Sequence, residues 1–204
     1  MDTSTPGPDA PVLNVVGDKV ALGPMRRDLV ALYDRWFNDF EAGLPYFLQL
    51  RPHTREAREA WYEHLAKDDP SCVDFLVYER ATLRPIGKCN LDQIDQFNRT
   101  AEFGILIGEK DCWGKGYGTE TAILVLDYAF TLLGLHNVML RVDAYNERAL
   151  RAYTRAGFRE FGRRRAARRR GGRAYDVVHM ECLATDFRGS RLAALLPRDP
   201  GGQP

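Results

Sequence analysis

Apolar side chains recur along the chain at two spacings, and together they predict a domain that mixes helices with strands. In residues 27–40 they fall three and four positions apart, which is typical of an amphipathic helix. Residues 54–65 also read as a helix, and Thr54 can serve as its N-cap. Shorter runs bounded by turn residues predict strands. The remaining expected elements are helices at 121–133 and 147–155 and strands or hairpins at 12–24, 73–80, 86–93, 100–108, 138–142, 159–165 and 175–183.

The order of these elements predicts an α/β fold in which a mixed central sheet has helices on both faces. With 204 residues, the chain is long enough for one domain with a substantial core, which we place at residues 12–184. Residues 1–11 are rich in proline, glycine, aspartate and threonine, so we expect them to be disordered. Residues 185–204 are expected to form a tail with one helical turn near 191–196.

The segment from Trp113 to Glu120 carries the strongest chemical signal, because it places three glycines between a predicted strand and a predicted helix. The N-terminus of a helix offers unpaired N–H groups and a partial positive charge, which suit phosphate oxygens. The spacing does not match a P-loop, since Lys115 is followed by glycine, nor a dinucleotide fingerprint, whose third glycine comes later. We therefore expect a pyrophosphate-bearing cofactor here. A flexible glycine turn without a ligand is the alternative.

Composition narrows the classes of partner. The formal net charge of +1 argues against nucleic acid as a main ligand. No apolar run is long enough to cross a membrane and no signal peptide is visible, so we expect a cytoplasmic protein that does not bind membranes. The four cysteines have neither metal-binding nor redox spacing, so we expect reduced thiols and no metal.

Several motifs occur together over roughly residues 17–183. They are Arg35-Trp36-Phe37-Asn38-Asp39, Ala101-Glu102-Phe103-Gly104, Trp113 to Glu120, Asn146-x-x-Ala149-x-x-x-Tyr153-x-x-x-Gly157-Phe158, and Gly172-Arg173-x-Tyr175-Asp176-Val177. This combination resembles the GCN5-related N-acetyltransferase (GNAT) superfamily, and most closely its RimJ/RimL-like branch, which acetylates protein N-termini and many small amines. The resemblance implies a central, mostly antiparallel sheet with one splayed parallel strand pair. Trp113 departs from the pattern, since the superfamily usually has Gln or Arg there.

The resemblance also implies that acetyl-CoA, a co-substrate, lies in the gap between the splayed strands. Its pantetheine would bind like an added strand along the backbone of Leu106 and Ile107, and the amides from Gly114 to Thr119 would hold the pyrophosphate. Asn146 would contact pantetheine through its side-chain amide, act as a helix N-cap, or do both. The expected cofactor-binding residues are Ile105, Leu106, Ile107, Trp113, Gly114, Lys115, Gly116, Tyr117, Gly118, Thr119, Asn146, Ala149 and Tyr153.

Two residues are candidates for catalysis. The tyrosine that matches Tyr153 lies near the thioester sulfur in the family, so Tyr153 is expected to protonate the departing thiolate. Glu102 is the candidate base, because an amine must be neutral to attack a thioester. The alternatives are a core tyrosine for Tyr153, and an exposed strand residue or a site for a cationic substrate for Glu102.

The sequence therefore predicts an N-acetyltransferase in which the amine attacks acetyl-CoA directly. The acceptor is a protein N-terminus, an antibiotic-type or metabolite amine, or a polyamine, and it is expected near Trp36, Tyr46 and His53. The alternative functions are a CoA-binding or regulatory module without turnover, and a transferase that uses a different acyl donor. A homodimer is an expectation from the family alone.

A run of arginines is the densest charge cluster in the chain, and its role stays open. We expect it on a hairpin between the last two strands, where a solvated mobile loop is the simplest interpretation. An acidic acceptor, a ribosomal or tRNA surface, or the CoA phosphates are sharper alternatives, since guanidinium groups suit carboxylates and phosphates. The run comprises Arg163, Arg164, Arg165, Arg168, Arg169, Arg170 and Arg173.

Overall fold

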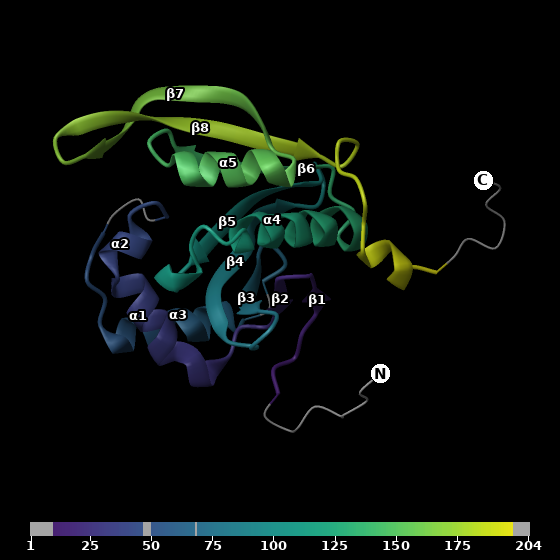
Figure 1. Cartoon of the computed structure of the whole chain (residues 1–204), viewed down its shortest axis with the longest axis horizontal. Helices are drawn as coiled ribbons and strands as arrows, with labels where there is room; N and C mark the ends of the chain where they lie inside the picture. The colour runs from purple at the N-terminus through teal and green to yellow at the C-terminus, as the bar shows by residue number, and fades with distance from the viewer. Residues whose placement is uncertain (1–9, 47–49, 68, 198–204) are drawn as a thin grey trace.

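An eight-stranded sheet in the order β1-β2-β3-β4-β5-β6-β8-β7 forms the centre of the computed structural model, which describes residues 10–46, 50–67 and 69–197 (Figure 1). Neighbouring strands are antiparallel except for β5 and β6, which are parallel. This confirms the predicted mixed, mostly antiparallel sheet. The strands are β1 (Val15–Val16), β2 (Val20–Gly23), β3 (Val73–Glu79), β4 (Pro85–Asp95), β5 (Thr100–Ile107), β6 (Asn137–Asp143), β7 (Arg159–Arg170) and β8 (Arg173–Leu183).

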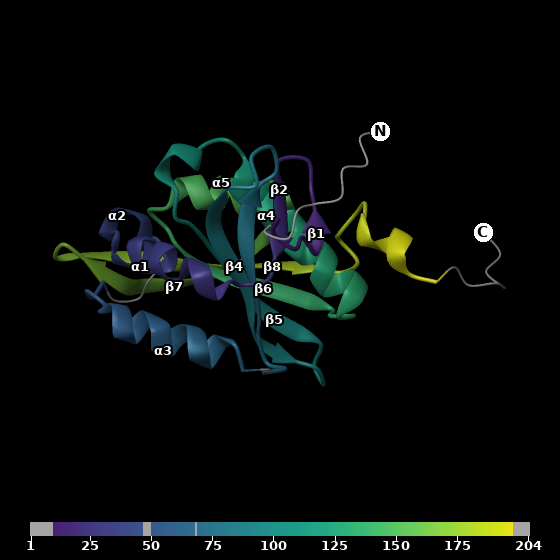
Figure 2. The same cartoon turned by 90° about the horizontal axis from the view of Figure 1, so that it is seen from below.

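Helices cover both faces of this sheet, as predicted (Figure 2). One face carries α1 (Val30–Asn38), α2 (Phe40–Gly43) and α3 (Arg55–Leu65), and the other carries α4 (Tyr117–Asp127) and α5 (Glu147–Ala156). A π-helical turn at Tyr128–Leu132 extends α4. Short 3-10 turns lie at Arg27–Leu29, Lys110–Cys112 and Leu192–Leu195. No helix in the described ranges has the length and apolar character needed to cross a bilayer.

The parallel pair diverges soon after it begins. Pairing between β5 and β6 is confined to Thr100–Glu102 against Asn137–Met139. From Phe103 to Ile107, β5 keeps β4 as its neighbour on one side only. The divergence opens a gap in the middle of the sheet, as the predicted splayed pair requires.

Alternation along β5 divides its side chains between two cores. Phe103 packs in the cluster beneath α4 and α5, and Leu106 packs with Tyr33 and Trp36 beneath α1. Because successive residues of a strand point to opposite faces, one short strand supports both helical layers. The gap beside β5 is therefore held between two packed layers.

The first predicted helix is divided in the structure. Asp39 is extended (φ −79°, ψ 101°) and ends α1. Its carboxylate accepts hydrogen bonds from the amides of Glu41 and Ala42 at 3.0 and 3.2 Å, so it caps α2. Aspartate favours such caps over a helix interior, and this local preference explains the break at a position where the apolar spacing continues.

The last two strands are longer than predicted, and this changes the setting of the arginine run. Arg163 to Arg170 lie within β7 rather than in a loop, and the turn is reduced to Gly171 and Gly172, both with positive φ. A run of arginines shows no alternation of apolar and polar residues that would indicate a strand. The backbone of this segment nevertheless forms the hydrogen bonds of a strand, because it pairs with β8. The run is therefore displayed on an edge strand, which a bulge with Ala166 at positive φ interrupts between Arg164 and Arg168.

The segment after β8 packs against the domain as far as Leu192, and the expected helical turn lies at Leu192–Leu195. Leu192 is buried, and Phe187 packs against Phe130 with ring centroids 5.6 Å apart. The carboxylate of buried Asp127 accepts hydrogen bonds from the amides of Arg191 and Leu192 at 2.7 and 3.1 Å. The predicted disordered segment 1–11 lies almost entirely outside the described residues.

Candidate active site

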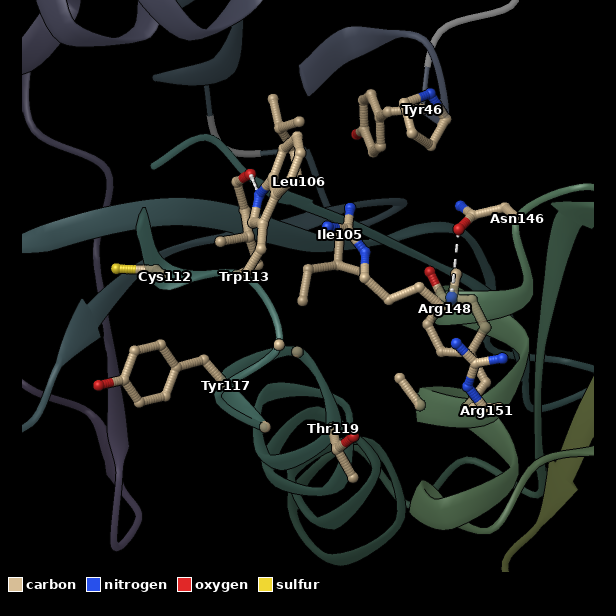
Figure 3. Close-up of a pocket in the computed structure, with 18 of the residues that line it drawn as sticks. Tyr46, Ile105, Leu106, Cys112, Trp113, Tyr117, Thr119, Asn146, Arg148 and Arg151 are labelled. Atoms are coloured by element: carbon tan, nitrogen blue, oxygen red, sulfur yellow. Dashed lines mark hydrogen bonds between the residues drawn. The ribbon is translucent and has the colours of Figure 1, made fainter. Parts of the chain in front are cut away.

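A cleft of about 310 Å³ occupies the gap between β5 and the start of α5. Figure 3 shows its side chains converging from β5, from the turn before α4, from α5 and from the end of α2. Twelve of the thirteen predicted cofactor-binding residues line the cleft, and Lys115 does not. The lining also includes Ala42, Pro45, Tyr46, Cys112, Arg148, Arg151, Ala152 and Arg155.

The glycine turn opens one end of the cleft onto the N-terminus of α4. Gly116 is the N-cap of α4 and has a left-handed backbone (φ 87°). The amides of Tyr117, Gly118 and Thr119 in the first turn have no carbonyl partner within the helix, and the N-cap supplies no side chain to bond them. A Cβ added at Gly114 or Gly118 would meet nothing within 4 Å. Bare backbone facing open space fits a pyrophosphate held by amides and by the helix dipole.

Lys115 is the one predicted cofactor-binding residue that lies outside the cleft lining. Its side chain is exposed, and its carbonyl oxygen accepts a hydrogen bond from the Lys19 ammonium at 3.2 Å. The structure therefore matches the alternative of a solvated loop lysine, and the backbone rather than this charge shapes the turn.

The wall formed by β5 offers less free backbone than expected. The carbonyl oxygen of Ile107 already accepts a hydrogen bond from the Trp113 indole N–H at 2.8 Å. The carbonyl oxygen of Leu106 lies against Gly87 of β4. Because successive peptide groups along a strand point to opposite edges, the backbone of Ile105 is the part of β5 best placed to face the gap. This corrects the expectation that Leu106 presents its backbone there.

The first turn of α5 begins with the expected asparagine. The Asn146 side-chain oxygen accepts a hydrogen bond from the Ala149 amide at 3.2 Å, so Asn146 is the N-cap of α5 (Figure 3). This cap uses the oxygen and leaves the side-chain NH₂ group available to a ligand. Both expected roles of Asn146 are therefore geometrically compatible.

Three arginines of α5 that sequence reasoning missed also line the cleft. Arg148, Arg151 and Arg155 are three and four positions apart, so they lie on one helix face. Their spacing of three and four positions in the predicted helix is the signal in the sequence that indicates a shared face. The Arg148 guanidinium carbon lies 4.1 Å from the centroid of the Trp113 ring, on the opposite wall.

Tyr153 lies inside the cleft, among aromatic rings. Its ring meets those of Phe103 and Phe158 edge to face, with centroids 6.2 and 6.0 Å apart. Burial raises the pKa of Tyr153, and nearby Tyr46 raises it further. Within the described ranges, the Tyr153 hydroxyl has no hydrogen-bond partner. A protonated phenol is thus available to a group bound in the cleft.

The three predicted acceptor residues occupy different settings. Tyr46 lines the cleft, where its hydroxyl donates a hydrogen bond to Asn90 at 3.1 Å and burial raises its pKa. Trp36 is a core residue, only 1% exposed, whose indole N–H donates to Glu109 at 2.7 Å. His53 is exposed and lies outside the cleft lining.

Glu102 lies where β5 and β6 are still paired, outside the cleft lining. Its carboxylate accepts hydrogen bonds from Arg141 at 2.7 Å and from Gln93 at 3.3 Å. The structure thus does not bring Glu102 together with Tyr153. A catalytic role for Glu102 would require water between its carboxylate and the amine.

Comparison with known proteins bears on this geometry. Residues 19–159 match the model of the acetyltransferase (GNAT) domain family. The chain is 30% identical over 115 residues to an uncharacterized N-acetyltransferase p20 of Bacillus licheniformis, and 35% identical over 111 residues to the spermidine N(1)-acetyltransferase of Vibrio cholerae. These matches cover 56% and 54% of this chain, and 64% of each relative.

The fold agrees with these matches. A crystal structure of the spermidine N-acetyltransferase from Vibrio cholerae, in complex with CoA and spermine, superposes with a TM-score of 0.74 at 28% identity. The superposition covers 83% of this chain and 98% of that one. The splayed strands, the glycine turn and the family match agree, and the chain belongs to the GNAT acetyltransferase family.

Proposed function

We propose that this protein transfers an acetyl group from acetyl-CoA to a primary amine. The observation that carries the proposal is one continuous cleft that joins the free amides of the α4 N-terminus to the hydroxyl of Tyr153. Acetyl-CoA supplies a thioester whose leaving group is a thiolate. The residues that would hold it are Ile105, Trp113, Gly114, Gly116, Tyr117, Gly118, Thr119, Asn146 and Ala149.

Residues at one end of the cleft bind the phosphates of the donor, and residues at the other end take part in the acyl transfer. The α4 amides and the guanidinium groups of α5 neutralise phosphate charge and fix the donor along the gap. The neutral amine attacks the thioester carbonyl, the carbon–sulfur bond breaks, and Tyr153 donates its proton to the departing sulfur. The nitrogen loses a proton to water or to a carboxylate reached through water, for which Glu102 remains the candidate.

The raised pKa of Tyr153 suits this role. A general acid must be protonated when the sulfur departs, and burial among Phe103 and Phe158 keeps this phenol neutral. Tyr46 lies at the same end of the cleft and is the better supported of the three acceptor candidates. A homodimer and a cytoplasmic location remain predictions.

The proposal is tested by following free thiol released from acetyl-CoA with a panel of amines. The panel contains peptides with free N-termini, aminoglycoside-type amines and spermidine, and the control omits the amine. Release that depends on an amine is the expected result. Calorimetric binding of CoA without release from any amine would instead favour a binding module or a different acyl donor.

A further inference from the structure

Four arginines of the β7–β8 hairpin carry no carboxylate partner among the residues that the structure describes. Their neighbours are paired: Arg163 with Glu160 and Asp176, Arg159 with Asp186, and Arg168 with Asp143. The whole chain has 29 basic and 28 acidic residues, so an uncompensated cluster of this size is a local feature rather than a reflection of net charge. The unpaired arginines are Arg164, Arg165, Arg169 and Arg173.

This cluster lies on an open sheet edge. β7 is the last strand of the sheet order, so no strand of the described ranges lies beside its outer backbone groups. The strand has twelve residues, with bulges between Glu160 and Gly162 and between Arg164 and Arg168, and on either side of the second bulge neighbouring arginines point to opposite faces of the open edge. An extended polypeptide can pair with such an edge while its own side chains meet the arginines on either face.

The hairpin also reaches the acceptor end of the cleft. Tyr175 of β8 packs against Tyr145 with ring centroids 4.8 Å apart, and the Tyr145 hydroxyl donates to the carbonyl oxygen of Leu44 at 3.4 Å. Leu44 directly precedes Pro45 and Tyr46, which line the cleft. Figure 2 shows the tip of the hairpin extending to the side of the molecule that holds α1 and α2. The open edge therefore begins beside the acceptor end.

Three carboxylates near that end are already paired with cations, whereas the exposed Asp92, which accepts a hydrogen bond from the Asn90 side chain at 2.5 Å, has no ion-pair partner among the described residues. Asp143 is buried and bonded to Arg168 at 2.8 Å, Glu102 is bonded to Arg141 at 2.7 Å, and the largely buried Lys88 is bonded to Asp74 at 2.6 Å. A polycation approaching along the hairpin would meet unpaired arginines and few free carboxylates. The distribution of charge thus opposes a polyamine and suits an acceptor that carries negative charge.

We propose that the acceptor is a polypeptide whose reactive amine is followed by an acidic stretch, and that this stretch lies along the outer edge of β7. The statement that the amine of this polypeptide is acetylated rests on the proposed acetyl transfer. The statement that its acidic stretch binds along β7 rests on the hairpin alone. A polypeptide fits better than nucleic acid, because an open strand edge offers backbone hydrogen bonds in the register of another strand. A stacking platform for bases would also need several aromatic side chains between the arginines, and none of residues 163–173 is aromatic.

The test compares acceptors that share one N-terminal dipeptide and differ only in the next six residues, which are acidic, neutral or basic, with spermidine as a fourth acceptor. Thiol release from acetyl-CoA gives kcat/KM for each with the full chain. The hairpin variant is Arg164→Gln with Arg169→Gln. The matched control is Arg55→Gln with Arg80→Gln, two exposed arginines outside the hairpin.

The acidic peptide is expected to exceed the neutral one in kcat/KM by roughly tenfold at low ionic strength, and by much less in about 1 M salt. The hairpin variant should lose most of this advantage while it acetylates the neutral peptide at the original rate, and the control should keep the advantage. A preference for spermidine or the basic peptide would overturn the proposal, as would an acidic preference that the hairpin variant retains.

Failure of the proposed acetyl transfer is recognised separately, because no acceptor would then release thiol. In that case the fluorescence anisotropy of a labelled acidic peptide decides the inference. Binding that the hairpin variant loses and the control keeps supports the docking surface. Absence of binding, or tighter binding of a single-stranded RNA with equal charge, overturns it.

Discussion

The guanidinium of Arg148 lies over the ring of Trp113, 4.1 Å from its centroid, and so bridges the two walls of the donor cleft. Arg148 belongs to α5, whereas Trp113 precedes the glycine turn on the other side. A contact of this kind contributes about 0.5–1 kcal/mol at an exposed site, so a ligand with several phosphate contacts can displace it. The Arg148–Trp113 pair thus connects the two walls of the cleft between which acetyl-CoA would bind.

The first prediction is that CoA separates this pair. The intrinsic fluorescence of Trp113 should change as CoA is added, and Arg148→Gln should shift the spectrum of the free protein in the same direction. Trp113→Phe serves as the control, because it removes the reporter and leaves Trp36 and Trp61 in place. An Arg148→Gln spectrum identical to that of the original protein would show that the pair is not the species that CoA displaces.

The second prediction concerns Tyr153→Phe. The substitution removes the proton donor and keeps the ring contacts with Phe103 and Phe158, so kcat should fall by roughly 100-fold or more. The dissociation constant of CoA should stay nearly unchanged, because the loss is confined to the transition state. Turnover at the original rate would rule out Tyr153 as the general acid.

The third prediction follows from the direction of the Tyr153 pKa. The protonated phenol is the active form, and burial raises its pKa above the usual value of about 10. Ionisation is therefore delayed to higher pH, and kcat should not fall near pH 10 as it would with an exposed tyrosine. It should rise as the acceptor amine loses its proton and then level off. A profile of kcat against pH that declines between pH 9 and 10 would contradict this assignment.

The donor side of the site was largely visible in the sequence, because its residues act through local spacing. Glycines at a strand-to-helix junction expose amides wherever they occur, and the interval from Asn146 to Tyr153 is two helical turns. Neither argument needs a distant contact. Lys115 differs from its neighbours, which line the cleft, because its own side chain is exposed to solvent.

The acceptor-binding residues could not be predicted from local spacing in the sequence, because the burial of these side chains depends on long-range packing. A tryptophan suits the rim of a binding site as well as a core. Trp36 contacts Gly108 and Glu109, more than seventy residues away, and such long-range contacts place it in the core. The arginine strand was missed for a similar reason. Its conformation comes from pairing with β8 rather than from any preference of arginine for strands.

The fourth prediction concerns the segment after β8. Asp127→Ala should lower the free energy of unfolding by about 1–3 kcal/mol, because the buried amide of Leu192 and the part-buried amide of Arg191 would lose their acceptor. Asp186→Ala is the control, since its carboxylate is 31% exposed and, among the residues described, forms an ion pair only with Arg159, at 3.4 Å. Urea titrations measure both. Equal stabilities would mean that residues 185–197 contribute little to the fold.

The fifth prediction separates binding from stability at the glycine turn. Gly118 lies in the first turn of α4, and a methyl group there would meet no protein atom within 4 Å. Gly118→Ala should therefore raise the free energy of unfolding by about 0.5 kcal/mol, since alanine is the better helix former. The same methyl group would occupy the space expected for phosphate, so the affinity for CoA should fall by roughly tenfold.

The matched control for this change is Gly162→Ala, because Gly162 in β7 also has open space at its Cβ and lies outside the cleft lining. It should leave the affinity for CoA unchanged. Calorimetry gives the affinities and thermal unfolding gives the stabilities of both variants. Because the expected effects of Gly118→Ala on stability and binding have opposite signs, general damage to the fold cannot imitate them. Unchanged affinity in Gly118→Ala would place the phosphates away from this turn.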